Sequence, residues 1–253
     1  IGTVYTSSTD AVEIYSIADG SRLTGIPQNP VSDLFNLGGD VVANEKYLVV
    51  SDQGSTLNGH SKEWQILVYN IEDANNPTLV WHIDYENTAQ FPMNGTEPIR
   101  MSHRQPSSLA LEGETLVIGD SGSARYNGSD SFGRVFIMNL AAAGDSTLIT
   151  KVIEHDDVDF SVTGIPNDSG SNHMLEQFGS AVAISNGKIA IGSLNARIGS
   201  QGSDGVVILV DTNSLGVNHG VIGAAIQSAP ARSGSQHNNG DSSRFGEMVE
   251  LRG

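Results

Sequence analysis

The chain has 253 residues and contains 13 basic and 29 acidic side chains, no cysteine and a formal net charge of −16. The acidic excess argues against binding to nucleic acid, because neutralising a phosphate backbone requires patches of Lys and Arg. The lack of cysteine excludes disulfides, thiolate catalysis and cysteine-ligated zinc, and no apolar run approaches the roughly 20 residues of a membrane-spanning helix. We therefore predict a protein without nucleic acid partners and without membrane insertion.

Short stretches of alternating apolar residues follow one another along the chain and predict an all-β fold. They fall into an N-terminal group and three later groups of four. The predicted strands are 1–6, 11–15 and 21–26, then 39–43, 47–52, 65–69 and 79–83, then 108–111, 115–120, 134–138 and 148–153, then 178–184, 188–192, 206–210 and 221–226. The groups recur with a period of roughly 70 residues, which indicates an internal repeat.

Each group of four opens with a predicted hairpin. In the last group the strands flank Asn186-Gly187, a pair that favours a two-residue turn because both central positions need a positive φ. The third strand of each group is an almost continuous apolar run, such as Val206–Val210, which is typical of a strand buried on both faces. Four strands in sequence order make a propeller blade, and repeating the blade around a ring leaves few exposed edges.

The two ends of the chain complement each other. Residues 245–251 match only the first strand of the repeat, whereas residues 1–26 supply only a second, third and fourth strand. We therefore predict a single domain over 1–253, an all-β β-propeller of about four four-stranded blades whose ring is closed by pairing of the N- and C-terminal strands. The predicted blades are 245–253 with 1–27, then 37–90, 107–165 and 178–228.

Two alternatives to this closed ring are a slice of a longer propeller and a larger ring made of two chains. The chain begins at Ile1 rather than Met. We therefore expect either a processed mature protein or a piece of a longer one.

Phe178-Gly179 and Phe245-Gly246 each open a predicted strand, and Ile191-Gly192-Ser193 ends one. In these features the chain resembles the FG-GAP repeat of integrin α-type propellers and of many bacterial extracellular proteins. The resemblance implies a secreted or cell-surface propeller that serves in adhesion or protein binding. Integrin-type blades often hold calcium between their first two strands. The corresponding turns here, such as 44–46, are too short to encircle an ion, so those calcium sites are not carried over.

Long connections are expected at one end of every blade, where the second strand runs to the third and the fourth strand runs to the next blade. The other end has mainly tight turns. Because long loops on a rigid scaffold usually carry binding functions, we expect a protein or glycan ligand on this long-loop face. The connections are 53–62, 121–133 and 194–205 within blades, and 27–37, 91–106, 166–177 and 229–243 between blades.

Acidic residues in or near these connections are candidate metal ligands, and calcium is the cofactor that their carboxylates would take. Asp52 and Asp120 occupy the same repeat position, where they either bind calcium or cap a turn. Asp156, Asp157 and Asp159 form the densest acidic segment. This segment either holds calcium or is a solvated acidic loop.

Three connections between blades each contain one histidine: His103, His173 and His237. These side chains either converge on a metal at the propeller axis or are ordinary loop histidines. The long connections also contain three N-glycosylation sequences, which begin at Asn94, Asn127 and Asn167. Such sequences are used only in a secreted eukaryotic protein.

No nucleophile elbow, zinc-binding helix motif, phosphate-binding loop or dinucleotide fingerprint occurs in the sequence. We predict a non-enzymatic extracellular module for binding, adhesion or assembly. One form of assembly is a fibre, in which the strand at 245–251 completes a blade of the next chain. The alternative function is that of a propeller hydrolase or lyase, which would act on polysaccharide with carboxylates and histidines near the axis.

Overall fold

The computed structural model describes the chain in separate ranges, and its described residues form an all-β structure with short 3-10 turns, such as Leu140–Ala142. No helix in these ranges is long and apolar enough to cross a membrane. The described residues are 10–27, 37–57, 60–84, 93–94, 97–98, 108–122, 133–142, 149–154, 157–158, 177–194, 196, 205–212, 225–227 and 247–252.

The chain divides into two compact units. The first comprises Ile1–Pro106, Gly113–Thr115 and Asn139–Ile149, and the second comprises Ser107–Glu112, Leu116–Met138 and Thr150–Gly253. Each unit is described separately below.

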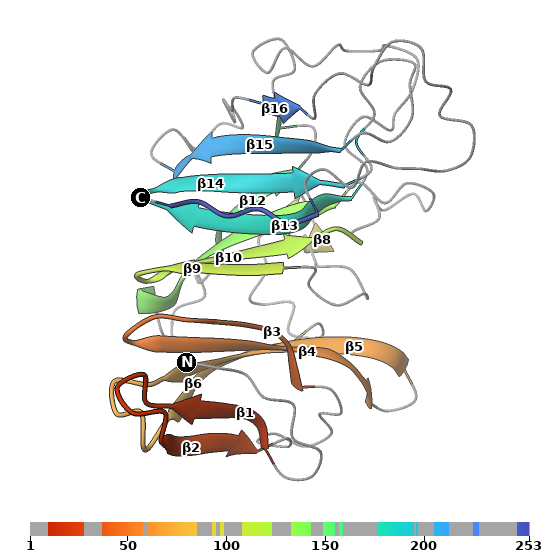
Figure 1. The fold of residues 1–253 in the computed structure, drawn as a ribbon. Coiled ribbons are helices and arrows are strands. Elements are labelled where there is room, and N and C mark those ends of the chain that lie inside the picture. Colours follow the sequence, from red (N-terminus) through yellow and green to blue (C-terminus); the bar gives the residue numbers. More distant parts are fainter. Residues whose placement is uncertain are drawn as a thin grey trace, which may run out of the picture. The chain divides into compact units, whose positions relative to one another are not determined.

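The first unit contains one four-stranded sheet and two strand pairs (Figure 1). The sheet runs in sequence order through β3 (Leu37–Ala43), β4 (Tyr47–Leu57), β5 (His60–Asn70) and β6 (Thr78–Asp84), and its neighbouring strands are antiparallel. Strand β1 (Asp10–Tyr15) pairs with β2 (Arg22–Pro27). A short pair is formed by β7 (Met93–Asn94) and β8 (Glu97–Pro98).

The second unit contains two four-stranded sheets, again with their strands in sequence order (Figure 1). One consists of β9 (Ser108–Glu112), β10 (Thr115–Asp120), β11 (Arg134–Asn139) and β12 (Ile149–Glu154). The other consists of β13 (Phe178–Ser185), β14 (Lys188–Ser193), β15 (Val206–Asp211) and β16 (Ala225–Gln227). The predicted groups of four strands are therefore confirmed as four-stranded sheets. Of the last predicted strand, 221–226, the part at 221–224 lies outside the described residues.

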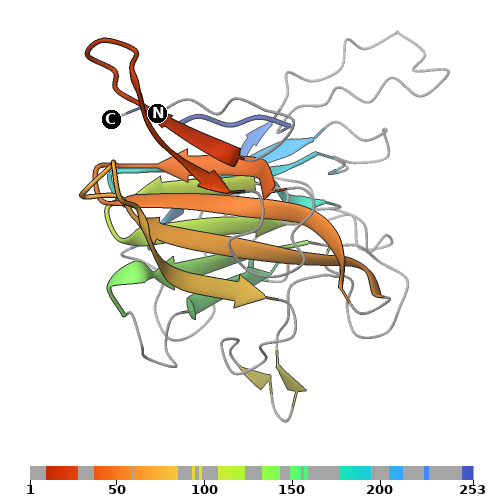
Figure 2. The same ribbon diagram turned by 90° about the horizontal axis from the view of Figure 1, so that it is seen from below.

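Two of the predicted connections contain strands. The expected loop at 53–62 is a hairpin, because β4 continues to Leu57 and pairs with β5 from His60 onward. Figure 2 shows these two strands running past the ends of β3 and β6. The sequence there is polar and contains Gly54, so it lacks the apolar alternation by which strands are recognised. The expected loop at 91–106 likewise contains the pair β7 and β8.

One backbone hydrogen bond recurs in all three four-stranded sheets, at the end where the first strand turns into the second. The residue that follows the third strand donates its N–H to a carbonyl of that turn. The bonds are Ile71 to Lys46, Leu140 to Glu114 and Thr212 to Gly187, each with an N···O distance of 2.8 Å. Residues at equal distances along the chain from these anchors are therefore structurally equivalent.

The four-stranded sheets are buried on both faces. In the first unit, Leu48, Val50 and Leu67 pack with Val12 and other residues of β1 and β2, which cover one face of the sheet. Alternate residues such as Val49, Ile66 and Val68 point to the other face and are also fully buried. This double burial accounts for the almost continuous apolar runs, since only a strand that is buried on both sides loses its polar alternation.

The second unit has its main core between the two sheets. Val117, Val135 and Ile153 of the first sheet belong to one cluster with Val182 and Ile208 of the second. The opposite face of β9–β12 carries the fully buried Leu116, Ile118, Phe136 and Met138. Two sheets that pack face to face in this way show the layering expected between successive repeats.

The predicted closing strand at 245–251 is not present in the described residues. Residues 247–252 have no strand assignment, and Ile1–Thr6, the strand expected to pair with them, lies outside the described part of the chain. Val249 and Leu251 instead pack against the face of β13–β15. The apolar residues of this segment therefore serve in packing on a sheet face.

Candidate functional site

Each four-stranded sheet has two different ends, because its strands are antiparallel and in sequence order. The turns after the first and third strands lie at one end, which we call the tight-turn end. The connection after the second strand lies at the other, the loop end. The repeat places Asp52, Asp120 and Ser193 at equivalent positions at the loop end.

Asp120 is the last residue of β10 and is fully buried. Asp120 has an interaction partner, and so does its equivalent Ser193, which is also fully buried. Asp52 lies in register with Leu37 on one side and Gln65 on the other. The predicted shared position is thus confirmed for the backbone, while calcium binding and turn capping both stay predictions.

An ion pair joins β11 and β12 at the loop end of the sheet β9–β12. Arg134 Nε, on the first residue of β11, lies 2.7 Å from Glu154 Oε1 on the last residue of β12, with side chains 17% and 32% exposed. Such a half-shielded, charge-assisted hydrogen bond fixes the ends of the two strands relative to each other. The pair was not recognised from the sequence, because its residues are 20 positions apart.

In the sheet β3–β6, the position equivalent to Arg134 is Gln65, which is buried. Its amide oxygen lies 2.8 Å from Nε2 of His82 on β6. Since an amide oxygen only accepts, the imidazole N–H donates this hydrogen bond. A side-chain contact therefore joins the third and fourth strands at the loop end of both sheets, an ion pair in one and a hydrogen bond in the other.

Asp157 belongs to the acidic segment predicted as a calcium site. Its Oδ2 accepts the backbone N–H of Glu154 at 2.9 Å, so the carboxylate caps the turn that follows β12. Its neighbours Asp156 and Asp159 lie outside the described residues. Within the described ranges no group of three or more His, Asp or Glu side chains gathers as a metal site requires.

The other predicted site residues are largely untested. Asn94 is the second residue of β7. The three histidines and the two remaining asparagines lie outside the described residues: His103, His173, His237, Asn127 and Asn167.

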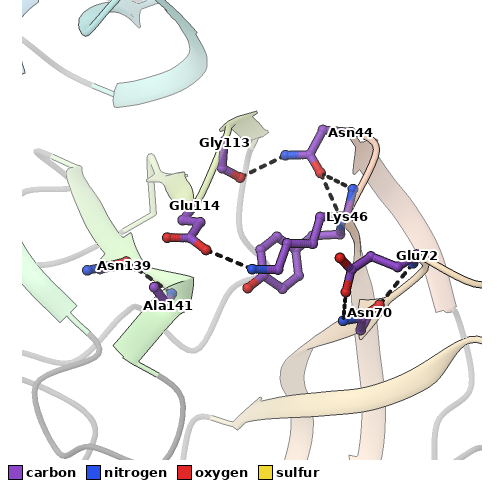
Figure 3. A network of polar contacts seen from close by, with 9 residues as sticks. Asn44, Lys46, Asn70, Glu72, Gly113, Glu114, Asn139 and Ala141 are labelled. Atoms are coloured by element: carbon purple, nitrogen blue, oxygen red, sulfur yellow. Dashed lines mark hydrogen bonds and ion pairs between the residues drawn. The ribbon is translucent and has the colours of Figure 1, made fainter.

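The tight-turn end carries a polar network that the sequence does not signal (Figure 3). Within the first unit, Asn44 Nδ2 donates to the carbonyl of Gly113 at 2.7 Å, and Lys46 Nζ donates to Glu114 Oε1 at 2.8 Å. The hydrogen bond that Lys46 donates to Glu114 is the largest cause of a raised pKa of Lys46, and its hydrogen bond with Tyr47 is the next. These contacts bind the turn after β3 to the turn 113–115.

A similar contact occurs inside the second unit. The carboxylate of Glu112 accepts the backbone N–H groups of Asn186 and Gly187, at 2.6 and 3.0 Å. The turns at which integrin-type blades often hold calcium are therefore linked to one another by protein groups. Both carboxylate oxygens of Glu112 thus accept hydrogen bonds from turn amides.

No protein-family model matches the chain. No curated protein matches it either. Among solved structures, the chain is similar to a computationally designed protein, Ika8, with 9% sequence identity and a TM-score of 0.33, over 87% of this chain and 75% of that one. A likeness at this level has no bearing on fold or function. The resemblance to FG-GAP repeats thus remains a prediction from the sequence.

Proposed function

We propose that the protein is a four-bladed β-propeller that acts as a non-enzymatic extracellular module for binding or adhesion and engages its ligand at the loop end. The observation that carries this proposal is the asymmetry of the sheets. The turns at one end are joined by the contact of Lys46 with Glu114 and by Glu112. The extended hairpin of β4 and β5 and the long connections 121–133 and 194–205 leave the other end. A rigid base with variable loops is the usual arrangement of a recognition surface.

The propeller part of the proposal is supported by the repeat. Three sheets share the same strand order and the same anchoring hydrogen bond after the third strand. Each carries buried apolar residues on both faces, as a blade between two neighbours must. Strands β1 and β2 supply only half of a further blade, and the terminal segments would supply the rest.

The preference for binding over catalysis is supported by the polar groups at the loop end. Arg134 is paired with Glu154, Gln65 with His82, and Asp157 with a backbone N–H. Groups held in this way serve the scaffold and are not poised as an acid and base pair. The net charge of −16 favours a ligand that is neutral or basic, since like charges repel at an interface.

A glycan and protein array probed with the labelled chain tests this function. Every hit is then incubated with the chain and analysed by mass spectrometry. We expect saturable binding of neutral glycans or basic proteins with the ligand recovered intact. Cleavage of a bound glycan would instead favour the polysaccharide hydrolase or lyase, and its loss in a His103/His173/His237 triple alanine variant would assign that activity to the histidines.

The place of binding is tested by a pair of variants. In the first, residues 197–204 of the connection between β14 and β15 are replaced by a Gly-Ser segment of equal length. In the second, Glu45 at the tight-turn end, whose side chain is exposed, is changed to Gln. We expect the first variant to lose binding and the second to retain it. The reverse pattern would place the ligand at the tight-turn end and contradict the proposal.

A further inference from the structure

One face of the last sheet carries a small apolar patch that we call the docking patch. It consists of Ala183, Ala190, Val207 and Leu209 on β13, β14 and β15, and it is covered in part by Val249 and Leu251. Figure 1 shows the segment 247–252, in dark blue, running along β13 on this face. The alternate residues of the same strands, such as Val182 and Ile208, face the sheet β9–β12.

The docking patch repeats a contact that already exists one repeat earlier, between the sheet β9–β12 and the strand β13. We call such a contact between a sheet and the first strand of the next repeat a joint. By position in the repeat, its members are equivalent to four residues of the sheet β9–β12, which form one core cluster with Val182 and Ile184 of β13. Val249 and Leu251 are in turn equivalent to Val182 and Ile184, counted from Phe245 and Phe178. The four equivalent residues are Ala110, Val117, Val135 and Ile137.

The backbone part of the joint is also repeated. Phe178 forms a parallel bridge with Gly133, and Gly179, at φ +83°, lies so close that a Cβ on it would be 2.6 Å from the carbonyl oxygen of Arg134. The next repeat has Gly205 at the position of Gly133, with φ +73° against +76°. In the sequence, Phe245-Gly246 repeats the pair Phe178-Gly179.

The terminal segment differs from β13 in how it is held. Strand β13 is paired with β14 along its length, whereas residues 247–252 have no strand assignment. Met248 is 89% exposed, and the ion pair between Glu250 and Arg252 is largely exposed as well. The segment is therefore seated on the patch without being fixed in a sheet, which makes it exchangeable.

We propose that the docking patch of one copy accepts the segment 247–252 of a second copy, so that chains associate head to tail. The contact is heterologous, because patch and segment are different surfaces, and such contacts generate open assemblies unless the rotation closes a ring. When one protein adds an extended segment to another, both the backbone of the segment and every second side chain contribute contacts. The proposal rests on the proposed blade architecture but not on the ligand-binding role.

Cross-linking of full-length chains tests the exchange. The chain has no cysteine, so single substitutions give unique attachment points for a short bismaleimide. Leu209→Cys chains are unfolded and refolded together with Leu251→Cys chains and then cross-linked. We expect a covalent heterodimer. The double variant Leu209→Cys/Leu251→Cys, refolded alone at high dilution, is expected to link within the chain.

The control pair is Ile137→Cys with Ile184→Cys, at the equivalent joint inside the chain, and it should link only within the double variant. A double variant at 209 and 251 that fails to link would show that the segment does not sit on the patch. Linking within the chain but never between chains would overturn the exchange. Either result would overturn the proposal and leave the array result, which involves the loop end, unaffected.

A second measurement uses the chain without substitutions, in case a cysteine variant fails to fold. A labelled synthetic peptide of residues 244–253 is titrated with the full-length protein, in parallel with the same peptide carrying Phe245→Ala and Leu251→Asp. We expect saturable binding of the first peptide and at least tenfold weaker binding of the second. Equal binding of both peptides, or none, would contradict the proposal.

Discussion

Gly133 and Phe178 form a parallel backbone bridge between the start of β11 and the start of β13. A Cβ on Gly133 would collide with the carbonyl oxygen of Phe178, and a Cβ on Gly119 would collide with that of Gly179. The two sheets of the second unit thus approach each other through backbone, with no room for side chains. This close approach gives a physical reason for the Phe-Gly pair that opens β13.

Replacing Gly179 by Ala is expected to destabilise the protein by about 2 to 4 kcal/mol, since it combines a left-handed backbone with a steric clash. Its φ is +83°, and its new Cβ would lie 2.6 Å from the carbonyl oxygen of Arg134. Urea unfolding measures the change. Gly20→Ala is the matched control, because Gly20 has φ +73° with nothing within 4 Å of the added Cβ, and it should cost about 1 kcal/mol. Equal losses in the two variants would contradict the close approach.

Replacing Glu112 by Ala is expected to lower stability by about 1 kcal/mol, because two turn amides lose a charged acceptor. Those amides belong to Asn186 and Gly187. Glu114→Ala is the comparison, since its ion pair with Lys46 is 38% and 45% exposed, and exposed pairs contribute little. Thermal unfolding of both variants measures the difference. A larger loss for Glu114 than for Glu112 would count against the role assigned to Glu112.

Replacing Tyr69 by Phe is expected to raise the unfolding free energy by about 1 kcal/mol, because it removes a buried polar group that has no compensating hydrogen bond. The hydroxyl of Tyr69 is buried and has no hydrogen-bond partner in the described residues. Burial raises the pKa of Tyr69 to about 12. Because the hydroxyl ionises more readily in the unfolded chain, the free energy of unfolding falls as the pH rises from the ordinary pKa of 10.0 toward the raised pKa.

The gain from Tyr69→Phe should therefore be constant up to neutral pH and should grow in alkali. Urea unfolding at a series of pH values measures it, and absorbance titration should show one tyrosine of the wild type ionising late. A destabilised Phe variant would mean that the hydroxyl has a partner.

Replacing Glu13 by Gln is expected to reduce the acid sensitivity of the first unit. Tyr15 donates its hydroxyl to Glu13 at 2.6 Å and Arg22 lies 3.1 Å away, and these contacts lower the pKa of Glu13 from its ordinary value of 4.5. A carboxyl with a lowered pKa stabilises the fold above its unfolded pKa and loses that effect as pH falls through the folded one. The wild type should exceed the variant in melting temperature at neutral pH and approach it in acid. Parallel curves would contradict this.

Much of the fold was predictable because alternating apolar residues mark the strands of each repeat. Strands such as β13 and β14 were placed to within two residues, since Asn186-Gly187 fixes their turn and buried residues line both sides. The hairpin of β4 and β5 beyond Asp52 was missed, because its polar residues give no burial signal.

The candidate site was less predictable, because it depends on pairs that are distant in the sequence. Arg134 and Glu154 come from different strands, and Glu112 reaches a turn in another repeat. The repeat identifies Asp120 as the residue equivalent to Asp52. It does not reveal that Asp120 is fully buried and has an interaction partner. The packing of Val249 on β13–β15 was not predicted either, since alternation alone does not identify the sheet that a segment contacts.

The hydrogen bonds from Ile71, Leu140 and Thr212 to the turns before them also bear on the order of folding. Each closes a segment of roughly 25 residues, and the entropy lost on closing a loop grows only slowly with its length. Every four-stranded sheet can therefore form from contacts that are near in sequence, which favours rapid folding. The contact of Val249 with β13–β15 follows these sheets in the sequence, so the three sheets can form before that contact is made.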